Sequence, residues 1–491
     1  MKRFGLVVAA LFSGSVLASS APGDMLVKTS VGSKAALTLQ SRLPQGTVVE
    51  DLGINGWVHV KLPAREVSAF NKSSILQIPG VLAVTPNHTI SLMATWKVQD
   101  AYVRAKILKA QAGGGFGDSE PPAPDNPAIP GAGSGGSGSD PLYSKQWGMN
   151  QMGVRDSWSK TKGSPEMVVA VIDTGVDYTH EDLVDNLWHN TGEMGKDANG
   201  RDKATNGIDD DGNGYVDDLI GWDFAANDNK PYDLTASQTE MLFNGGNPGH
   251  GTHCAGNVAA RADNGKGITG VAPNVRVMSI RFISEKGQGT NADAIKSIKY
   301  AVDNGAKVLS NSWGSEGDDP KDPETQALKD AIIYAQDRGV LFIAAAGNGH
   351  QGKGYDNDSD AKPGFPASYP IANIVSVAAI DEAGNLGSFS NWGLKTVHLG
   401  APGVKVFSTV TNSQKYSDTV IDMPGVITAT WDGTSMATPH VAGAAALYWS
   451  AHPDKNWQQV KDALLSTVKR SSVLSGKTVS GGQLDVGNLM R

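Results

Sequence analysis

The chain has 491 residues, enough for two or more domains with a large core. Its formal net charge of −8, without a long basic run, excludes nucleic acid as an expected partner. The single cysteine, Cys254, excludes an intramolecular disulfide, so an exported form has to be stabilised by its core or by bound metal.

Residues 1–20 are typical of a secretory signal peptide. A basic start precedes an apolar run over residues 4–12, and small residues follow near Ala18. The run is too short to span a bilayer, and no later stretch is long and apolar enough to do so. We therefore expect cleavage after Ala18 or Ser20, a secreted protein (extracellular or periplasmic) and no membrane partner.

Residues 21–93 alternate strand-like and helix-like patterns. A β-α-β-β-α-β order predicts a small ferredoxin-like α+β domain. The expected strands cover residues 25–29, 47–53, 57–63 and 80–93, and the expected helices cover residues 33–43 and 64–78.

Residues 94–140 separate this domain from the rest of the chain. Residues 97–110 could form a short amphipathic helix, and the following stretch is rich in Gly, Pro and Ser. Such a composition cannot bury a core, so we expect a flexible linker.

Residues 141–491 form the second expected folded domain. Continuous apolar runs, such as residues 167–173, 339–347 and 374–380, alternate with helical patterns. Strands that are buried on both faces have this composition, so we predict a mostly parallel α/β sheet with helices on both sides.

Three segments of this unit carry candidate catalytic residues. Asp173 ends a buried-type strand, where sites of open α/β sheets lie, although a lone Asp there is often a cap or turn residue. His250 and His253 begin a helix of small residues and could each be structural or metal ligands. Ser435 precedes another small-residue helix, whose N-terminus can stabilise an oxyanion or simply be capped by serine.

The segments VIDTGVD, HGTHCAG and GTSMATPHVAG, in this order, resemble the three motifs of the subtilisin family of serine proteases. The resemblance covers the chain from about residue 140 onward and implies a three-layer αβα fold. It implies that Ser435 is the nucleophile, that His250 is the general base and that Asp173 orients His250. It leaves His253 with a structural role.

Further segments resemble the substrate cleft of the family. The resemblance implies that Asn348, after an apolar strand, donates to the oxyanion together with the backbone N–H of Ser435, although a plain turn is the alternative. Trp313 could instead belong to the core. The other implied cleft residues are Ser312 and Gly314 on a substrate-pairing strand and Ala345, Gly347 and Gly364 in the walls of a specificity pocket.

Two acidic segments predict structural calcium. Asp209, Asp211, Asn213 and Asp217 occupy positions 1, 3, 5 and 9 of a calcium-loop pattern. Ile220 stands where the pattern has its closing Glu, and a solvated acidic turn is the alternative. The family resemblance implies a second site with Asp182 and a loop in which Asp263 and Asn264 are alternative ligands.

The sequence thus predicts a secreted serine endopeptidase that acts on protein or peptide substrates. The resemblance implies that the N-terminal domain is an inhibitory propeptide, so we expect a self-processing zymogen and a monomer. The cleavage point stays open: after Met93, near Ala110 or within the linker. The alternative is a calcium-binding pseudoprotease on the same scaffold, and a lipase or esterase is excluded because the serine lacks a GxSxG elbow.

Overall fold

The computed structural model describes residues 21–30, 33–68, 70–92, 140–232, 249–284, 287–316, 325–350, 352–410, 422–423, 427–428 and 430–491. The expected signal peptide and the expected helix and linker between residues 94 and 139 lie outside the described residues. Within the described part of the chain, no helix is both long and apolar enough to cross a membrane.

The N-terminal unit has an antiparallel sheet in the order β2-β3-β1-β4, with its elements in the predicted β-α-β-β-α-β order. Apolar side chains of the strands and of both helices form one small core. The elements are β1 (Asp24–Thr29), α1 (Ser33–Arg42), β2 (Val48–Ile54), β3 (Trp57–Lys61), α2 (Lys72–Leu76) and β4 (Val81–Pro86).

Two elements of this unit differ from the prediction. The helix expected over residues 64–78 is reduced to a 3-10 turn and α2, because Asn71 and Ser74 form a capping box that starts a new helix. The last expected strand is split into β4 and β5 (Thr89–Leu92). At the break, Asn87 N still donates to Asp24 O of β1, and the Asn87 side chain accepts a hydrogen bond from Ala292 N, outside this unit.

The larger unit is built on a nine-stranded sheet in the order β20-β21-β15-β14-β12-β10-β6-β8-β7, parallel except for the edge strand β20. Its central strands are buried along their whole length, as their continuous apolar runs predict. The strands are β6 (Val168–Asp173), β7 (Gly221–Asp223), β8 (Arg276–Arg281), β10 (Val308–Asn311), β12 (Leu341–Ala345), β14 (Ile374–Ile380), β15 (Leu399–Pro402), β20 (Lys469–Arg470) and β21 (Gly482–Gln483).

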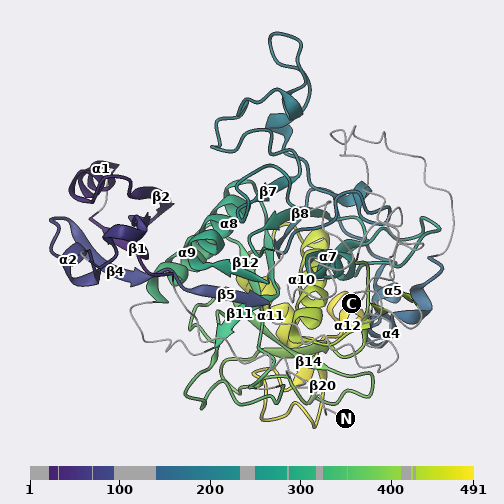
Figure 1. Cartoon of the computed structure of the whole chain (residues 1–491). Helices are drawn as coiled ribbons and strands as arrows, with labels where there is room; N and C mark the ends of the chain where they lie inside the picture. The colour runs from purple at the N-terminus through teal and green to yellow at the C-terminus, as the bar shows by residue number, and fades with distance from the viewer. Residues whose placement is uncertain are drawn as a thin grey trace, which may run out of the picture.

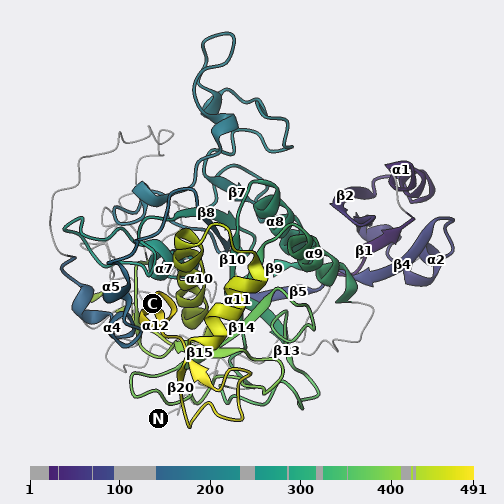
Figure 2. The ribbon, with the colours of Figure 1, turned by 180° about the vertical axis from the view of Figure 1, so that it is seen from behind.

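Helices cover both faces of this sheet, as Figures 1 and 2 show from opposite sides. Alternate side chains of β6 belong to different cores: Val169 and Val171 pack with α7 and α10, whereas Ala170 and Ile172 pack with α8 and α9. The predicted three-layer α/β fold is thereby confirmed. The helices are α7 (His250–Ala259), α8 (Asn291–Asp303), α9 (Gln326–Asp337), α10 (Thr434–Ala451), α11 (Trp457–Ser466) and α12 (Val486–Leu489).

A second sheet joins the two units. Its order is β13-β11-β5-β9, so β5 from the N-terminal part of the chain lies between β9 (Gln288–Thr290) and β11 (Trp313–Glu316). Figure 1 shows β5 running from the N-terminal unit into the body of the larger one. It pairs antiparallel with both neighbours, and β13 (Gly364–Phe365) closes the other edge of β11.

Candidate active site

Asp173 and His250 form a fully buried pair at the carboxyl edge of the central sheet. Asp173 is the last residue of β6, and His250 is the first residue of α7. His250 Nδ1 lies 2.8 Å from Asp173 Oδ1 and 3.0 Å from Oδ2. Burial by itself would lower the pKa of His250, but the Asp173 carboxylate outweighs it and raises the pKa. The pair therefore holds the imidazole in one orientation and stabilises the imidazolium that forms when Nε2 takes up a proton.

Ser435 lies in the first turn of α10 and is also fully buried. Its Oγ donates a hydrogen bond to Ser312 O at 2.9 Å, and Ser312 Oγ donates to Ser435 O at the same distance. These two hydrogen bonds with Ser312 fix the start of α10, where unpaired backbone N–H groups and the helix dipole favour a negative charge.

Cys254 brings the histidine and the serine together. Its Sγ lies 4.0 Å from His250 Nδ1 and donates to Ser435 O at 3.6 Å. Burial raises the pKa of this thiol, so it stays protonated and can donate. His250 Nε2 is buried and has no hydrogen-bond partner among the described residues, which leaves it able to receive a proton.

Asn348 follows β12 and is held by the residue before Ser435. Asn348 Oδ1 accepts from both the backbone N and the Oγ1 of Thr434, each at 2.9 Å. The side-chain oxygen is thus held by the residue before Ser435, and the NH₂ group is the donor that this side chain can offer. The contact of Thr434 with Asn348 was not predicted from the sequence. The position of Thr434 directly before Ser435 is the only sequence feature that could have indicated it.

The implied pocket walls are small and tightly packed. Gly347 has φ +113°, and a Cβ there would meet Asn391 Nδ2 at 2.4 Å, so only glycine fits. Gly364 lies opposite Glu316 in the second sheet, and Ala345 is fully buried at the end of β12.

Strand β11, which begins directly after Ser312, is already paired with β5 of the same chain. Trp313 pairs with Leu92, and Gly314 pairs with Ser91. The Trp313 side chain is fully buried against Phe282, with ring centroids 5.1 Å apart, which agrees with the core alternative for this side chain. Trp313 therefore contributes its backbone, and not its ring, to the pairing of β11 with a neighbouring strand.

His253 has structural contacts. Its Nε2 lies 3.1 Å from Val406 O, and its ring stacks on Trp431 with centroids 4.4 Å apart. The ring of Trp431 also stacks at 6.4 Å from that of His250. One indole thus covers both histidines.

A first acidic site lies around Asp182. Asn264 Nδ2 donates to Asp182 Oδ1 at 2.8 Å, whereas Asp263 is ion-paired with Lys162 at the surface. Of the two alternatives, Asn264 therefore contacts Asp182. Asp140, which sequence reasoning missed, is buried nearby, and neither carboxylate oxygen has a well-formed hydrogen bond among the described residues.

Burial also raises the pKa of Asp140 to about 6 and that of Asp182 to about 7, and neighbouring carboxylates add to both shifts. Such a set of buried oxygen ligands fits a hard cation such as calcium.

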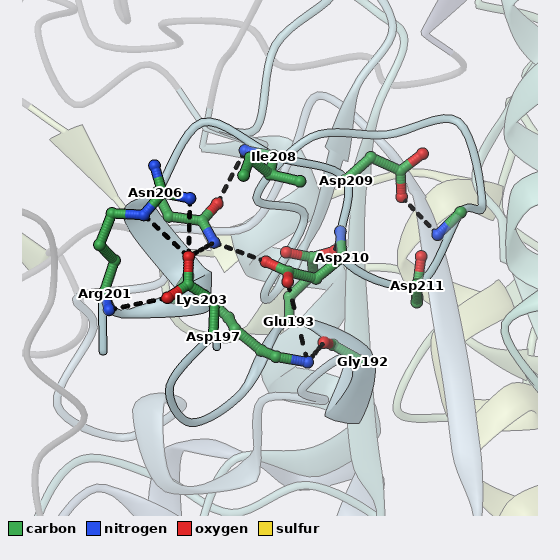
Figure 3. A network of polar contacts seen from close by, with 12 residues as sticks. Gly192, Glu193, Asp197, Arg201, Lys203, Asn206, Ile208, Asp209, Asp210 and Asp211 are labelled. Atoms are coloured by element: carbon green, nitrogen blue, oxygen red, sulfur yellow. Dashed lines mark hydrogen bonds and ion pairs between the residues drawn. The ribbon is translucent and has the colours of Figure 1, made fainter. Parts of the chain in front are cut away.

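In the second acidic site, part of which Figure 3 shows, carboxylates of the predicted loop accept backbone hydrogen bonds. Asp209 accepts hydrogen bonds from the backbone N of Gly212 and Gly214, each at 2.8 Å, and Asp217 accepts from Gly207 N. These two carboxylates hold turns. Asp218, not Asp217, lies beside Asp211, and Asn213 donates to both of them.

Comparison with known proteins gives concordant matches. The Subtilase family (peptidase S8) matches residues 164–483. A thermophilic serine proteinase of Bacillus sp. (strain AK1) is 35% identical over 67% of this chain and 62% of its own. Thermitase of Thermoactinomyces vulgaris is 32% identical over 68% of this chain and 92% of its own.

Among solved structures, fervidolysin from Fervidobacterium pennivorans, described as a keratinolytic enzyme related to subtilisin, has a similar fold. The TM-score is 0.62 at 24% identity, over 96% of this chain and 61% of that one. The chain thus spans about three fifths of the length of the Bacillus proteinase and of fervidolysin.

Proposed function

The chain belongs to the subtilase family, and on that premise we propose that it is a serine endopeptidase that forms an acyl-enzyme intermediate. The observation that carries the proposal is the buried Asp173–His250 pair, packed through Cys254 against the helix start that bears Ser435. A pseudoprotease on this scaffold would need none of these contacts.

In the proposed reaction, Ser435 Oγ turns about its Cα–Cβ bond from Ser312 O toward His250 Nε2. It gives its proton to that nitrogen and attacks the scissile carbonyl carbon. The imidazolium, stabilised by Asp173, then protonates the leaving amine as the C–N bond breaks. Water releases the acyl group by the same route in reverse.

A serine-directed fluorophosphonate tests this chemistry directly. We expect one label per molecule, on Ser435, and no label in the His250→Ala variant. Labelling of another serine, or equal labelling of both proteins, would mean that the pair does not activate Ser435.

The oxyanion of the tetrahedral intermediate would be held by Ser435 N and Asn348 Nδ2. Asn348→Ala is expected to lower kcat about 10²–10³-fold with little change in KM, the loss known for the equivalent donor in this family. Thr434→Val is the matched control: it leaves the Thr434 N hydrogen bond to Asn348 in place, and we expect a smaller loss. If Asn348→Ala and the unchanged protein have equal kinetics, Asn348 does not stabilise the oxyanion.

We propose that the N-terminal unit is an inhibitory propeptide. Its strand β5 occupies the position between β9 and β11 that an extended substrate would take by β-augmentation. The unit is further held by Asp330 of α9, which accepts from Lys28 Nζ at 2.6 Å and from Trp57 Nε1 at 2.8 Å. Burial opposes ionisation, but these hydrogen bonds outweigh it and lower the pKa of Asp330.

Asp330→Asn is expected to weaken retention of the cleaved unit about tenfold or more, because hydrogen bonds to a charged group contribute roughly 1.5–3 kcal/mol. The measurement is peptidase activity of the processed protein as a function of dilution, which releases the inhibitor. Asp337→Asn, an exposed change on the same helix, is the control. If the activity of the two variants depends on dilution in the same way, Asp330 does not hold the N-terminal unit.

We also propose that Asp140, Asp182 and Asn264 hold a structural calcium ion, which would neutralise the buried carboxylates and fix the loop after α7. The basic and apolar residues before Ala18 support export of the protein, with cleavage after Ala18 or Ser20. We further propose that the released enzyme is monomeric and acts on protein or peptide substrates.

A further inference from the structure

Two buried asparagines contact the segments that the family resemblance makes walls of the specificity pocket. Asn357 lies in the loop between β12 and β13, and Asn391 lies in the loop between β14 and β15. Asn357 is 4% exposed and Asn391 is 0% exposed, so each amide needs hydrogen-bond partners inside the protein. Neither residue belongs to one of the three family motifs.

The Asn357 amide spans the two walls. Its Nδ2 donates to Ala346 O at 2.9 Å, and its Oδ1 accepts from Gly364 N at 3.2 Å. Ala346 lies between Ala345 and Gly347 on one wall, and Gly364 begins β13 on the other. Because one planar amide bonds to the backbone of both segments, it fixes the distance between them.

Asn391 supports this bridge from behind. Its Nδ2 donates to Asn357 Oδ1 at 3.1 Å, and its backbone N donates to Gly347 O at 2.9 Å. A Cβ on Gly347 would meet Asn391 Nδ2 at 2.4 Å, so the amide packs directly on that wall. Since Asn391 Nδ2 and Gly364 N both donate to the same atom of Asn357, the Asn357 amide is held in the orientation that reaches both walls.

The loops that carry the two asparagines are tied to each other along their backbones. Asn357 N donates to Trp392 O at 2.7 Å, and Trp392 N donates to Tyr355 O at 3.0 Å. Asn391 Oδ1 accepts from Tyr355 N at 3.3 Å. The bridge is therefore set in place before a substrate binds, which reduces the entropy that binding has to overcome.

The bridge and the walls are electrically neutral. The two amides bond to backbone groups or to each other, and the walls consist of alanine and glycine. A neutral site of this kind does not compensate the burial of a substrate carboxylate or ammonium group. Small wall residues at a fixed distance instead suit a large apolar side chain.

We propose that Asn357, supported by Asn391, determines the substrate preference of the proposed peptidase. By fixing the distance between the pocket walls, the pair selects a large apolar side chain on the substrate residue whose carbonyl carbon is attacked. This inference rests on the proposed function, because it concerns the substrate of the same site. Both asparagines act through the backbone of the walls, so they are positioning residues and take no part in bond making.

The test compares two chromogenic peptides that are identical except for Phe or Ala directly before the scissile bond. The ratio of their kcat/KM values is measured for the protein expressed at full length and for its Asn357→Ala and Asn391→Ser variants. Asn373→Ala is the matched control. Asn373 is also 0% exposed, and its Nδ2 donates to Val340 O at 2.9 Å, at the opposite end of β12 from the pocket walls.

We expect the unchanged protein to prefer Phe, and we expect Asn357→Ala to lower the Phe:Ala ratio about tenfold or more, because discrimination in an apolar pocket depends on close fit. Asn391→Ser should lower it by a smaller factor and keeps the test valid if Asn357→Ala does not fold. Asn373→Ala should leave the ratio unchanged.

Fluorophosphonate labelling of Ser435 in the same proteins separates the two proposals. If all variants are labelled but Asn357→Ala and Asn391→Ser keep the ratio of the unchanged protein, the inference about the asparagines is wrong and the proposed function stands. An equal fall of the ratio in Asn373→Ala, or no preference for Phe in the unchanged protein, would also overturn the inference. No labelling of the unchanged protein would overturn the proposed function itself.

Discussion

Replacing Ser435 with alanine is expected to lower kcat for peptide hydrolysis about 10⁶-fold, the loss that follows removal of the nucleophile in a serine protease of this kind. The change removes only Oγ and its hydrogen bond to Ser312 O, so the start of α10 should keep its place. Activity is measured with a chromogenic peptide, on protein whose folding is checked by thermal unfolding.

Ser312→Ala is the control for this variant. It removes the hydrogen bond from Ser312 Oγ to Ser435 O but leaves the nucleophile intact. A neutral hydrogen bond contributes about 0.5–1.5 kcal/mol, so we expect a loss of about tenfold at most. If Ser435→Ala retains activity close to that of Ser312→Ala, another group performs the attack.

Asp173→Asn is expected to lower kcat about 10⁴-fold with the fold intact. An asparagine NH₂ would donate to His250 Nδ1, which now lies 2.8 Å from the carboxylate, and would force the proton onto Nε2. That nitrogen could then no longer accept the proton of Ser435. The kinetics are measured across pH, because losing the carboxylate also lowers the pKa of His250.

Two outcomes separate a positioning role from a general loss of stability. The acidic limb of the kcat/KM profile should move to lower pH in Asp173→Asn. Asp177→Asn, a nearby change whose carboxylate accepts from Thr179, should leave that limb in place. A profile that does not move in Asp173→Asn would contradict the assigned role.

The sequence predicts the layers well, because a fully buried parallel strand leaves a local signature. The apolar run that ends at Asp173 is strand β6, and alternate side chains of that run enter the two helical layers. The place of Asp173 at the strand end could be predicted from the same signature. Roles for Asp173, His250, Ser435 and Asn348 remain proposals that rest on motif order and on the geometry described above.

What the sequence does not predict depends on contacts between distant residues. Residues 80–93 look like one strand, but they form β4 and β5 in two different sheets, and between them Asn87 bonds to both Asp24 O and Ala292 N. The acidic segment shows the same limit. Glu193 lies beside Asp211 and Asp218 but comes from a separate turn, so the spacing of the acidic segment gives no sign of it.

The central claim, a self-processing serine protease, is tested most directly by intact mass. Purified full-length protein and its Ser435→Ala variant are incubated side by side with calcium and analysed by mass spectrometry. We predict that the unchanged protein loses its N-terminal unit, with a new N-terminus between Met93 and residue 140, while Ser435→Ala stays whole. Two whole chains, or two chains cut at the same place, would contradict the account.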